Sequence, residues 1–375
     1  MSQLPEKRKS TGSSLVRRLS SDRSTPRSRS QLFQVQVPLV SKQPPGTCKD
    51  DKYDLKMTTQ IVQSLSSFHN GIVWSHCYNF DGTLLATAGK DGKVNIWEIN
   101  EGMIKKEPKT VFSKHTGEVL SVTFIDNSII CSSSSTKELL LWNATNGNEI
   151  QNVTIEDVCL SMKFCQSKKR LLIGLMNGMV QCYSLTKQNK IEVYQQYDVH
   201  ACVTAVDLYT KEEESTTYII GTINGTVYIL YDYDDKMQMV KTSSVKDEVL
   251  ITDIQTIGGE DLCYITYSNN KIIVYTLPDL GFICKYKGMT TSCSVIKPTL
   301  NEDQTVLFIG SKDNNIYAFP HVPSLTKRSV DLMGCKFHLF VTEKKPVLHV
   351  SQIPKTQNLL LIDSEGLAAI FTMKI

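Results

Sequence analysis

The chain repeats one short pattern seven times: a turn pair is followed, five residues after its second member, by the large apolar residue that ends a strand-like run. Pairs such as Asp-Gly and Asn-Gly are strong hairpin signals, because tight turns need residues that tolerate a positive φ. The copies are Asp91-Gly92 with Trp97, Thr136-Lys137 with Trp142, Asn177-Gly178 with Tyr183, Asn224-Gly225 with Leu230, Asn269-Asn270 with Tyr275, Asp313-Asn314 with Phe319, and Glu365-Gly366 with Phe371. Successive end residues lie 41 to 52 residues apart. A unit of about 40–45 residues with four strands is the signature of a β-propeller blade.

The rest of each repeat agrees with a propeller, since apolar or alternating runs precede each turn and no segment keeps a 3.6-residue period. One blade cannot bury both of its faces, whereas seven blades in a ring bury them against one another. After the last turn only the strand Leu367–Phe371 remains, so the seventh blade lacks an outer strand, which we expect Thr58–Ser67 to supply. The sequence thus predicts an all-β, seven-bladed propeller at residues 58–375, preceded by a disordered, basic, Ser/Arg-rich tail and linker at residues 1–57.

The basic character of the chain is concentrated at its N-terminus. Residues 1–30 contain eight Lys or Arg and two Asp or Glu, so they carry +6, and the rest of the chain carries −3 of the total of +3. Low hydrophobicity and high net charge predict disorder. Ser10, Ser20 and Thr25 are candidate phosphorylation sites, because the first two follow basic residues and the third precedes Pro26. Each phosphate adds about −1.5 to −2 charges, so modification would weaken the tail's expected weak contact with an anionic membrane.

The eleven cysteines include no C-x-x-C pair and are interpreted as reduced thiols of a cytosolic protein. The first thirty residues have no apolar signal-peptide core, and no apolar stretch reaches the roughly 18 residues of a membrane span. We therefore expect a cytoplasmic protein.

No motif in the sequence indicates catalysis. There is no phosphate-binding G-x(4)-G-K-[ST] loop and no H-x-x-x-H pair, so no catalytic residue, cofactor or metal is predicted. His76 occupies a strand position that is apolar in the next repeat (Val122), and we interpret it as a core residue. Asp232, Asp234 and Asp235 are interpreted as a solvated loop, because no EF-hand spacing accompanies them.

The segments FHNG…LLATAGKDGKVNIW and KHTGEVLSVTF…LLLW resemble WD repeats. The resemblance implies that His69, Thr87, Asp91 and Trp97 form the buried, hydrogen-bonded tetrad of that family, in which the Asp orients the His. The second repeat departs from the pattern, because Thr136 occupies the Asp position. The third, fifth and sixth repeats lack the His, and the literal Trp-Asp pair is absent throughout.

The stretch Thr266–Phe319 resembles the WD repeat-containing protein 44 group more closely. It carries Lys-Tyr-Lys-Gly at Lys285–Gly288, Ser-x-Ile-Lys at Ser294–Lys297 and Gly-Ser-x-Asp at Gly310–Asp313, in the order found in that group. Members of the group are effectors of Rab GTPases on recycling endosomes, and their Rab-binding segment lies ahead of the propeller. The resemblance covers about residues 69–375, so it carries over no Rab-binding residue.

These observations predict a non-catalytic, monomeric scaffold that binds other proteins in membrane traffic, with a small GTPase or a trafficking complex as its partner. It would lie in the cytoplasm, peripherally on endosomal membranes. The alternative is a nuclear or RNA-linked WD-repeat scaffold, suggested by the Arg-Ser dipeptides of RSTPRSRS, although no specific nucleic-acid binding is expected. An enzyme built on a propeller is the third and least favoured class.

Overall fold

The computed structural model describes residues 58–65, 67–211, 215–233, 236–244, 249–257, 260–291, 296–321, 330–333, 335–338 and 345–374. All of them belong to one compact unit, Pro44–Ile375. The predicted tail and linker at residues 1–57, with the candidate sites Ser10, Ser20 and Thr25, lies outside the described residues.

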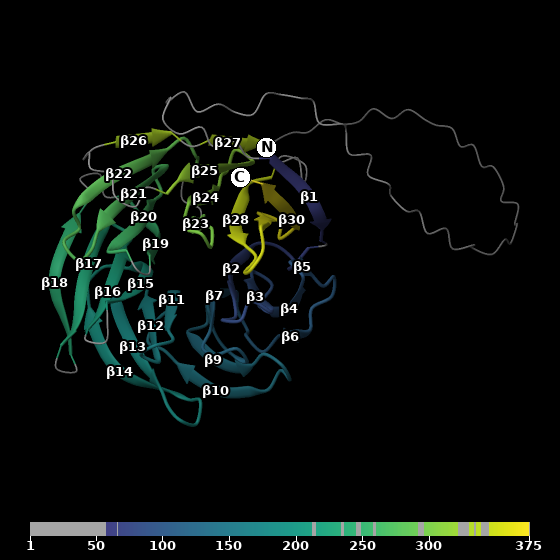
Figure 1. Cartoon of the computed structure of the whole chain (residues 1–375). Coiled ribbons are helices and arrows are strands. Elements are labelled where there is room, and N and C mark those ends of the chain that lie inside the picture. Colours follow the sequence, from purple (N-terminus) through teal and green to yellow (C-terminus); the bar gives the residue numbers. More distant parts are fainter. Residues whose placement is uncertain are drawn as a thin grey trace, which may run out of the picture. The chain divides into compact units, whose positions relative to one another are not determined.

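The described residues form seven β-sheets arranged in a ring, so the predicted seven-bladed propeller is confirmed (Figure 1). In blades 1 to 6, the first strand in sequence lies toward the centre, and the later strands lie progressively outward. Blades 1 to 3 consist of β2 (Val73–Tyr78), β3 (Leu84–Gly89), β4 (Val94–Asn100), β5 (Met103–Ile104) and β6 (Thr110–Phe112); β7 (Val119–Phe124), β8 (Ile129–Ser134), β9 (Glu138–Asn143) and β10 (Glu149–Thr154); and β11 (Cys159–Cys165), β12 (Arg170–Leu175), β13 (Met179–Leu185) and β14 (Ile191–Asp198).

The remaining blades follow the same order. Blades 4 to 7 consist of β15 (Val203–Lys211), β16 (Ser215–Thr222), β17 (Thr226–Tyr233) and β18 (Lys236–Ser244); β19 (Ile251–Ile257), β20 (Leu262–Tyr267), β21 (Lys271–Thr276), β22 (Phe282–Lys287) and β26 (Val330–Met333); β23 (Thr299–Leu300), β24 (Val306–Gly310), β25 (Asn315–Pro320) and β27 (Cys335–His338); and β28 (Val347–Gln352), β29 (Asn358–Asp363), β30 (Ala368–Lys374) and β1 (Thr58–Ser64).

The ring is closed by β1, which is the outermost strand of blade 7. It pairs antiparallel with β30, and Ile61 lies opposite Phe371. Figure 1 shows the purple β1 beside the yellow β30, where the two ends of the described chain meet. The predicted closure is therefore confirmed, with one difference: the strand ends at Ser64 rather than at Ser67. The backbone N–H of Leu65 still donates to Ala368 O at 2.9 Å, so the contact with blade 7 continues past the strand.

The hydrophobic core is divided into seven clusters, and each cluster joins the facing sheets of two neighbouring blades. Strand β3 shows how this arises from the sequence, because successive side chains of a strand point to opposite faces. Leu85 packs into the cluster shared with blade 7, whereas Ala86 packs into the cluster shared with blade 2. The second strands carry apolar residues on both faces because both faces are buried.

Blade 5 departs from the four-stranded plan that the repeats predict. Its outer strand β22 is paired in parallel with a fifth strand, β26, which comes from the segment that follows β25 in blade 6. The chain then returns as β27 and pairs antiparallel with β25. One loop of blade 6 thus covers the outer edge of blade 5, and the unpaired edge that β22 would otherwise present is occupied.

Candidate functional site

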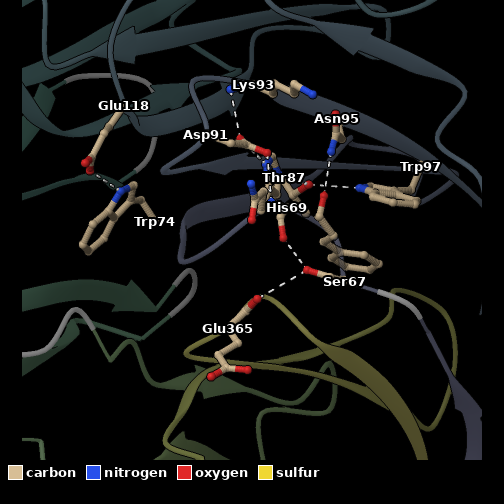
Figure 2. A network of polar contacts seen from close by, with 12 residues as sticks. Ser67, His69, Trp74, Thr87, Asp91, Lys93, Asn95, Trp97, Glu118 and Glu365 are labelled. Carbon is tan, nitrogen blue, oxygen red and sulfur yellow. Dashed lines mark hydrogen bonds and ion pairs between the residues drawn. The ribbon is translucent and has the colours of Figure 1, made fainter. Parts of the chain in front are cut away.

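The four side chains of the proposed tetrad are brought together in blade 1 (Figure 2). His69 lies just before β2, and its Nδ1 is 2.8 Å from Asp91 Oδ1 in the β3–β4 turn. Its Nε2 is 2.9 Å from Thr87 Oγ1, and Trp97 Nε1 donates to the same oxygen at 3.0 Å. Because the Asp91 carboxylate only accepts hydrogen bonds, a neutral His69 carries its proton on Nδ1 and accepts the Thr87 hydroxyl at Nε2. Every member is hydrogen-bonded, as a buried polar set must be.

The Asp91 carboxylate holds two segments of blade 1 together. Its Oδ2 accepts the backbone N–H of Asn70 at 3.1 Å, and its Oδ1 accepts that of Lys93 at 3.2 Å. Partial burial raises the pKa of Asp91, but the hydrogen bonds from His69 and Asn70 outweigh it and hold the pKa below its ordinary value. The charge therefore fixes the segment that enters β2 against the turn between β3 and β4.

The local sequence is fitted to this arrangement. A Cβ atom at position 89 would lie 2.6 Å from the His69 ring, so Gly89 leaves the space that the imidazole occupies. Gly92, the second turn residue, has a φ of +74°, which glycine adopts without strain. The Phe68 ring stacks on Trp97 with their centroids 4.3 Å apart, which covers the buried end of the tetrad.

Blade 2 keeps three members of the set and loses the fourth. His115 Nε2 is 2.7 Å from Ser132 Oγ, and Trp142 Nε1 donates to the same oxygen at 2.9 Å. Thr136 donates from its hydroxyl to Glu138 Oε2 at 3.0 Å, and that carboxylate lies 3.6 Å from His115 Nδ1, which has no hydrogen-bond partner. Burial lowers the pKa of His115, and the Glu138 charge only partly opposes this. The imidazole is buried with half of its hydrogen-bonding capacity unused.

Two pairs of opposite charges lie on the inner strands of blades 3 to 5 and just before β23 of blade 6. Lys163 Nζ on β11 is 3.4 Å from Asp207 Oδ1 on β15, and Lys297 Nζ is 3.8 Å from Asp253 Oδ1 on β19. Asp207 is fully buried and also accepts the backbone N–H of Thr256 at 2.7 Å. Asp207 raises the pKa of Lys163, while burial raises the pKa of Asp253 to about 6 against the opposing effect of Lys297. These contacts link neighbouring blades at the centre of the ring.

Two histidines meet where blade 7 adjoins blade 1. His349 Nε2 donates to the Val73 carbonyl at 2.7 Å, and His76 Nε2 is 2.9 Å from Ser351 Oγ. The two rings meet edge to face, with their centroids 5.0 Å apart. Burial, reinforced by the positive charge of Lys297, lowers the pKa of His349 to about 4; burial, His349 and Lys297 lower that of His76 well below its ordinary value. Both side chains form polar contacts between blades 7 and 1; His349 is buried, whereas His76, interpreted from the sequence as a core residue, is half-buried.

The other residues considered from the sequence do not gather into a site. Within the described ranges, no group of three or more His, Cys, Asp or Glu side chains is placed to hold a metal ion. Asp232 accepts a hydrogen bond from Gln195 Nε2 at 2.6 Å, which links blades 3 and 4, whereas Asp234 and Asp235 lie outside the described residues. The part of the chain that the structure describes also contains no helix long and apolar enough to cross a membrane.

Sequence reasoning missed the charged inner-strand residues, although a signal for them exists. Asp253 and His349 occupy the same register position, opposite the residue before the end of the second strand. Lys163 and Asp207 share a second position, two residues further along the first strand. If the first strands of the blades are aligned at these positions, the charged residues stand out from the residues that the other blades have there. The turns, which define the repeats most clearly, carry no such signal.

Comparison with known families and proteins supports the resemblance that the motifs indicate. The family "WD domain, G-beta repeat" matches residues 60–98, which hold the complete tetrad. WD repeat-containing protein 44 of Xenopus laevis is 25% identical over an alignment that covers 73% of this chain and 36% of that protein.

Two further relatives share less with this chain. An uncharacterized WD repeat-containing protein of Schizosaccharomyces pombe is 18% identical over 71% of this chain and 50% of its own length. The COMPASS component SWD3 of Saccharomyces cerevisiae is 25% identical over 49% of this chain and 64% of its own length. The chain thus spans less than two thirds of each of these relatives. It carries a WD repeat in a seven-bladed propeller and resembles WD repeat-containing protein 44.

Proposed function

We propose that this protein is a non-catalytic interaction scaffold in intracellular membrane traffic. WD-repeat propellers bind other proteins and act as scaffolds, and the likeness to WD repeat-containing protein 44 is the observation that carries the choice of pathway. The polar groups that could suggest chemistry are engaged in structural contacts: the tetrad fixes a turn, and the inner-strand charges and the His76–His349 pair link blades. A small GTPase or a trafficking complex is the proposed partner, at endosomal membranes.

Localisation and partner recovery test this proposal together. The tagged full-length chain is imaged against endosomal and nuclear markers, and its partners are cross-linked and identified after the lysate is loaded with GDP or with a non-hydrolysable GTP analogue. We expect endosomal puncta and a partner whose recovery depends on the nucleotide. A nuclear signal with RNA-bound partners would favour the nuclear scaffold that the Arg-Ser dipeptides suggest and would contradict the traffic role.

The proposed role of the basic tail has a separate test. Its +6 charge adds at most about 1 kcal/mol of attraction per basic residue held at an anionic lipid surface, so the expected attachment is weak and sensitive to salt. Co-sedimentation with anionic liposomes should fall at physiological salt and in a variant with Ser10, Ser20 and Thr25 all changed to Glu. If removal of residues 1–30 leaves liposome binding unchanged, the tail does not contact the membrane.

A further inference from the structure

One position recurs in all seven blades, directly before each turn pair. Its backbone N–H donates to a carbonyl in the segment that leads into an inner strand, at 2.9 to 3.0 Å. The bonds run from Lys90 to Ile72, Ser135 to Glu118, Met176 to Val158, Ile223 to Cys202, Ser268 to Leu250, Lys312 to Thr290 and Ser364 to Pro346. Five of these seven residues are Lys or Ser. Only blades 3 and 4 have apolar side chains there, and Met176 and Ile223 are 46% and 52% exposed.

Met176 and Ile223 lie beside turns that one segment of the chain links. The backbone N–H of Val199 donates to Gly178 O in the blade 3 turn at 3.0 Å, and a Cβ atom on Gly178 would lie 3.0 Å from the backbone nitrogen of Ala201. Ile223 is in turn bonded to Cys202. The turn of blade 3, the segment 198–202 and the turn of blade 4 therefore lie in series. We call Met176, Cys202 and Ile223 the blade 3–4 strip.

The surroundings of the blade 3–4 strip are acidic. Glu156 is exposed, Asp157 forms an ion pair with Lys137 at 3.0 Å, and Asp198 lies 2.9 Å from His200. With His200 neutral, three carboxylates face one Lys, which leaves a formal charge of −2. Burial and then the Asp157 charge raise the pKa of Cys202.

The other blades show that this composition is not a requirement of the fold. The same turn and the same backbone hydrogen bond form with Lys90 in blade 1 and with Lys312 in blade 6. Exposed apolar side chains on the equivalent turns of two neighbouring blades, where the fold accepts Lys or Ser, favour an interaction surface. Carboxylates around such a surface favour a partner of positive charge and speed its approach.

We propose that the blade 3–4 strip docks a partner segment that carries apolar side chains next to Lys or Arg residues. This inference rests on the proposed scaffold function and names the surface and the chemistry of its partner. The apolar side chains of the partner cover Met176 and Ile223, while its basic residues lie against Asp157 and Asp198.

The test uses the full chain and two sets of fluorescein-labelled 12-residue peptides. Each peptide of the first set has two Leu or Phe residues flanked by Lys or Arg, and the matched set has Glu at the basic positions. Fluorescence anisotropy at two salt concentrations should show binding of basic peptides only, weaker at high salt. Met176→Lys combined with Ile223→Lys, which introduces the residue of blades 1 and 6, should lower the affinity at least tenfold. Asp157→Asn with Asp198→Asn should reduce the salt dependence.

A matched control separates loss of the strip from a general effect of added charge. Val193→Lys with Met239→Lys changes two apolar side chains of β14 and β18 that are 57% and 47% exposed, and it should leave peptide binding unchanged. Equal melting temperatures of the variants would show that the fold is intact. Binding of acidic peptides, no binding by the wild-type chain, or binding that the strip variants do not alter would each overturn the proposal.

Two further readouts keep this inference distinct from the scaffold function. If wild type and the Met176→Lys, Ile223→Lys variant recover the same cellular partners, the scaffold stands and the strip is excluded. If wild type recovers no partner, the scaffold function itself fails. A concentration-dependent dimer in analytical ultracentrifugation, abolished by the double variant, would assign the strip to self-association and would also overturn the proposal.

Discussion

Blades 1 and 2 contain the same set of hydrogen-bonded side chains, which is complete in blade 1 and lacks one member in blade 2. Each has a His before its first strand, a hydroxyl on its second strand and a Trp on its third, and the spacing between these atoms is nearly identical. Blade 1 adds Asp91, which satisfies His69 Nδ1, whereas blade 2 has Thr136 and leaves His115 Nδ1 without a partner. The difference teaches that the set is not required for a blade to form, because burial of the apolar faces is common to both.

The largest effect should come from opening the ring that holds both blades. A protein beginning at Gly71 lacks β1 and also Leu65 and Phe68, so it leaves the edge of β30 and the rest of the blade 7–blade 1 cluster exposed. We expect it to be insoluble or to melt far below a protein beginning at Cys48. Circular dichroism gives the melting temperatures of the two proteins. Equal melting temperatures would show that the pairing of β1 with β30 adds nothing to the stability of the ring.

Asp91→Ala should cost blade 1 about 1–3 kcal/mol, because it leaves His69 Nδ1 and the Asn70 N–H without their acceptor. Thr136→Ala, at the same position of blade 2, is the matched control and should cost less than about 0.5 kcal/mol, since its hydroxyl is exposed. Urea unfolding of both variants gives the comparison. Equal losses would mean that the carboxylate contributes nothing beyond the turn.

Introducing the turn residues of blade 1 into blade 2 should stabilise the protein. Thr136→Asp combined with Glu138→Lys reproduces the Asp91 and Lys93 of blade 1, and we expect a gain of about 1 kcal/mol from satisfying His115 Nδ1. Thr136→Asp alone should gain less, because the new carboxylate lies beside Glu138. If the double variant unfolds at the same urea concentration as wild type, the unpaired imidazole nitrogen has no measurable cost.

The smallest effect is a difference in acid sensitivity between the two blades. The pKa of His115 is lowered in the folded state, so its contribution to stability is complete above the unfolded value of about 6.5 and is lost as the pH falls below it. The pKa of Asp91 is also lowered, so its contribution is complete above about 3.9 and is lost only below that value. His115→Gln should reduce the slope of stability against pH between 7 and 5, whereas Thr136→Ala, which removes no titratable group, should leave that slope unchanged. His76 and His349 contribute to the same slope in every variant, because their pKa values are lowered as well.

Much of the fold was readable from the sequence because each blade repeats the same turn offset and the same two-sided apolar strand. The tetrad residues could be named for a similar reason, since the motif of residues 69–97 is complete. Strand β26 could not be foreseen, because its parallel pairing with β22 joins segments of different blades and follows no repeat. The pairs Lys163–Asp207 and Asp253–Lys297 form only when the ring brings the inner strands together. Met176 and Ile223 are ordinary apolar residues in the sequence, and their meaning appears only when the seven equivalent positions are compared.

The pairing of β1 with β30 has a consequence for how the protein is made. The first strand of the propeller leaves the ribosome early, yet its partner is complete only after residue 374 has been synthesised. Until then, the face of blade 1 that packs against blade 7 is exposed, as is the free face of the most recently folded blade, and β1 has no strand to pair with. A nascent chain of this kind needs protection from aggregation throughout translation. A message truncated within blade 7 would yield a chain that contains every earlier blade but cannot close the ring. Its apolar interface would be exposed to quality-control proteases.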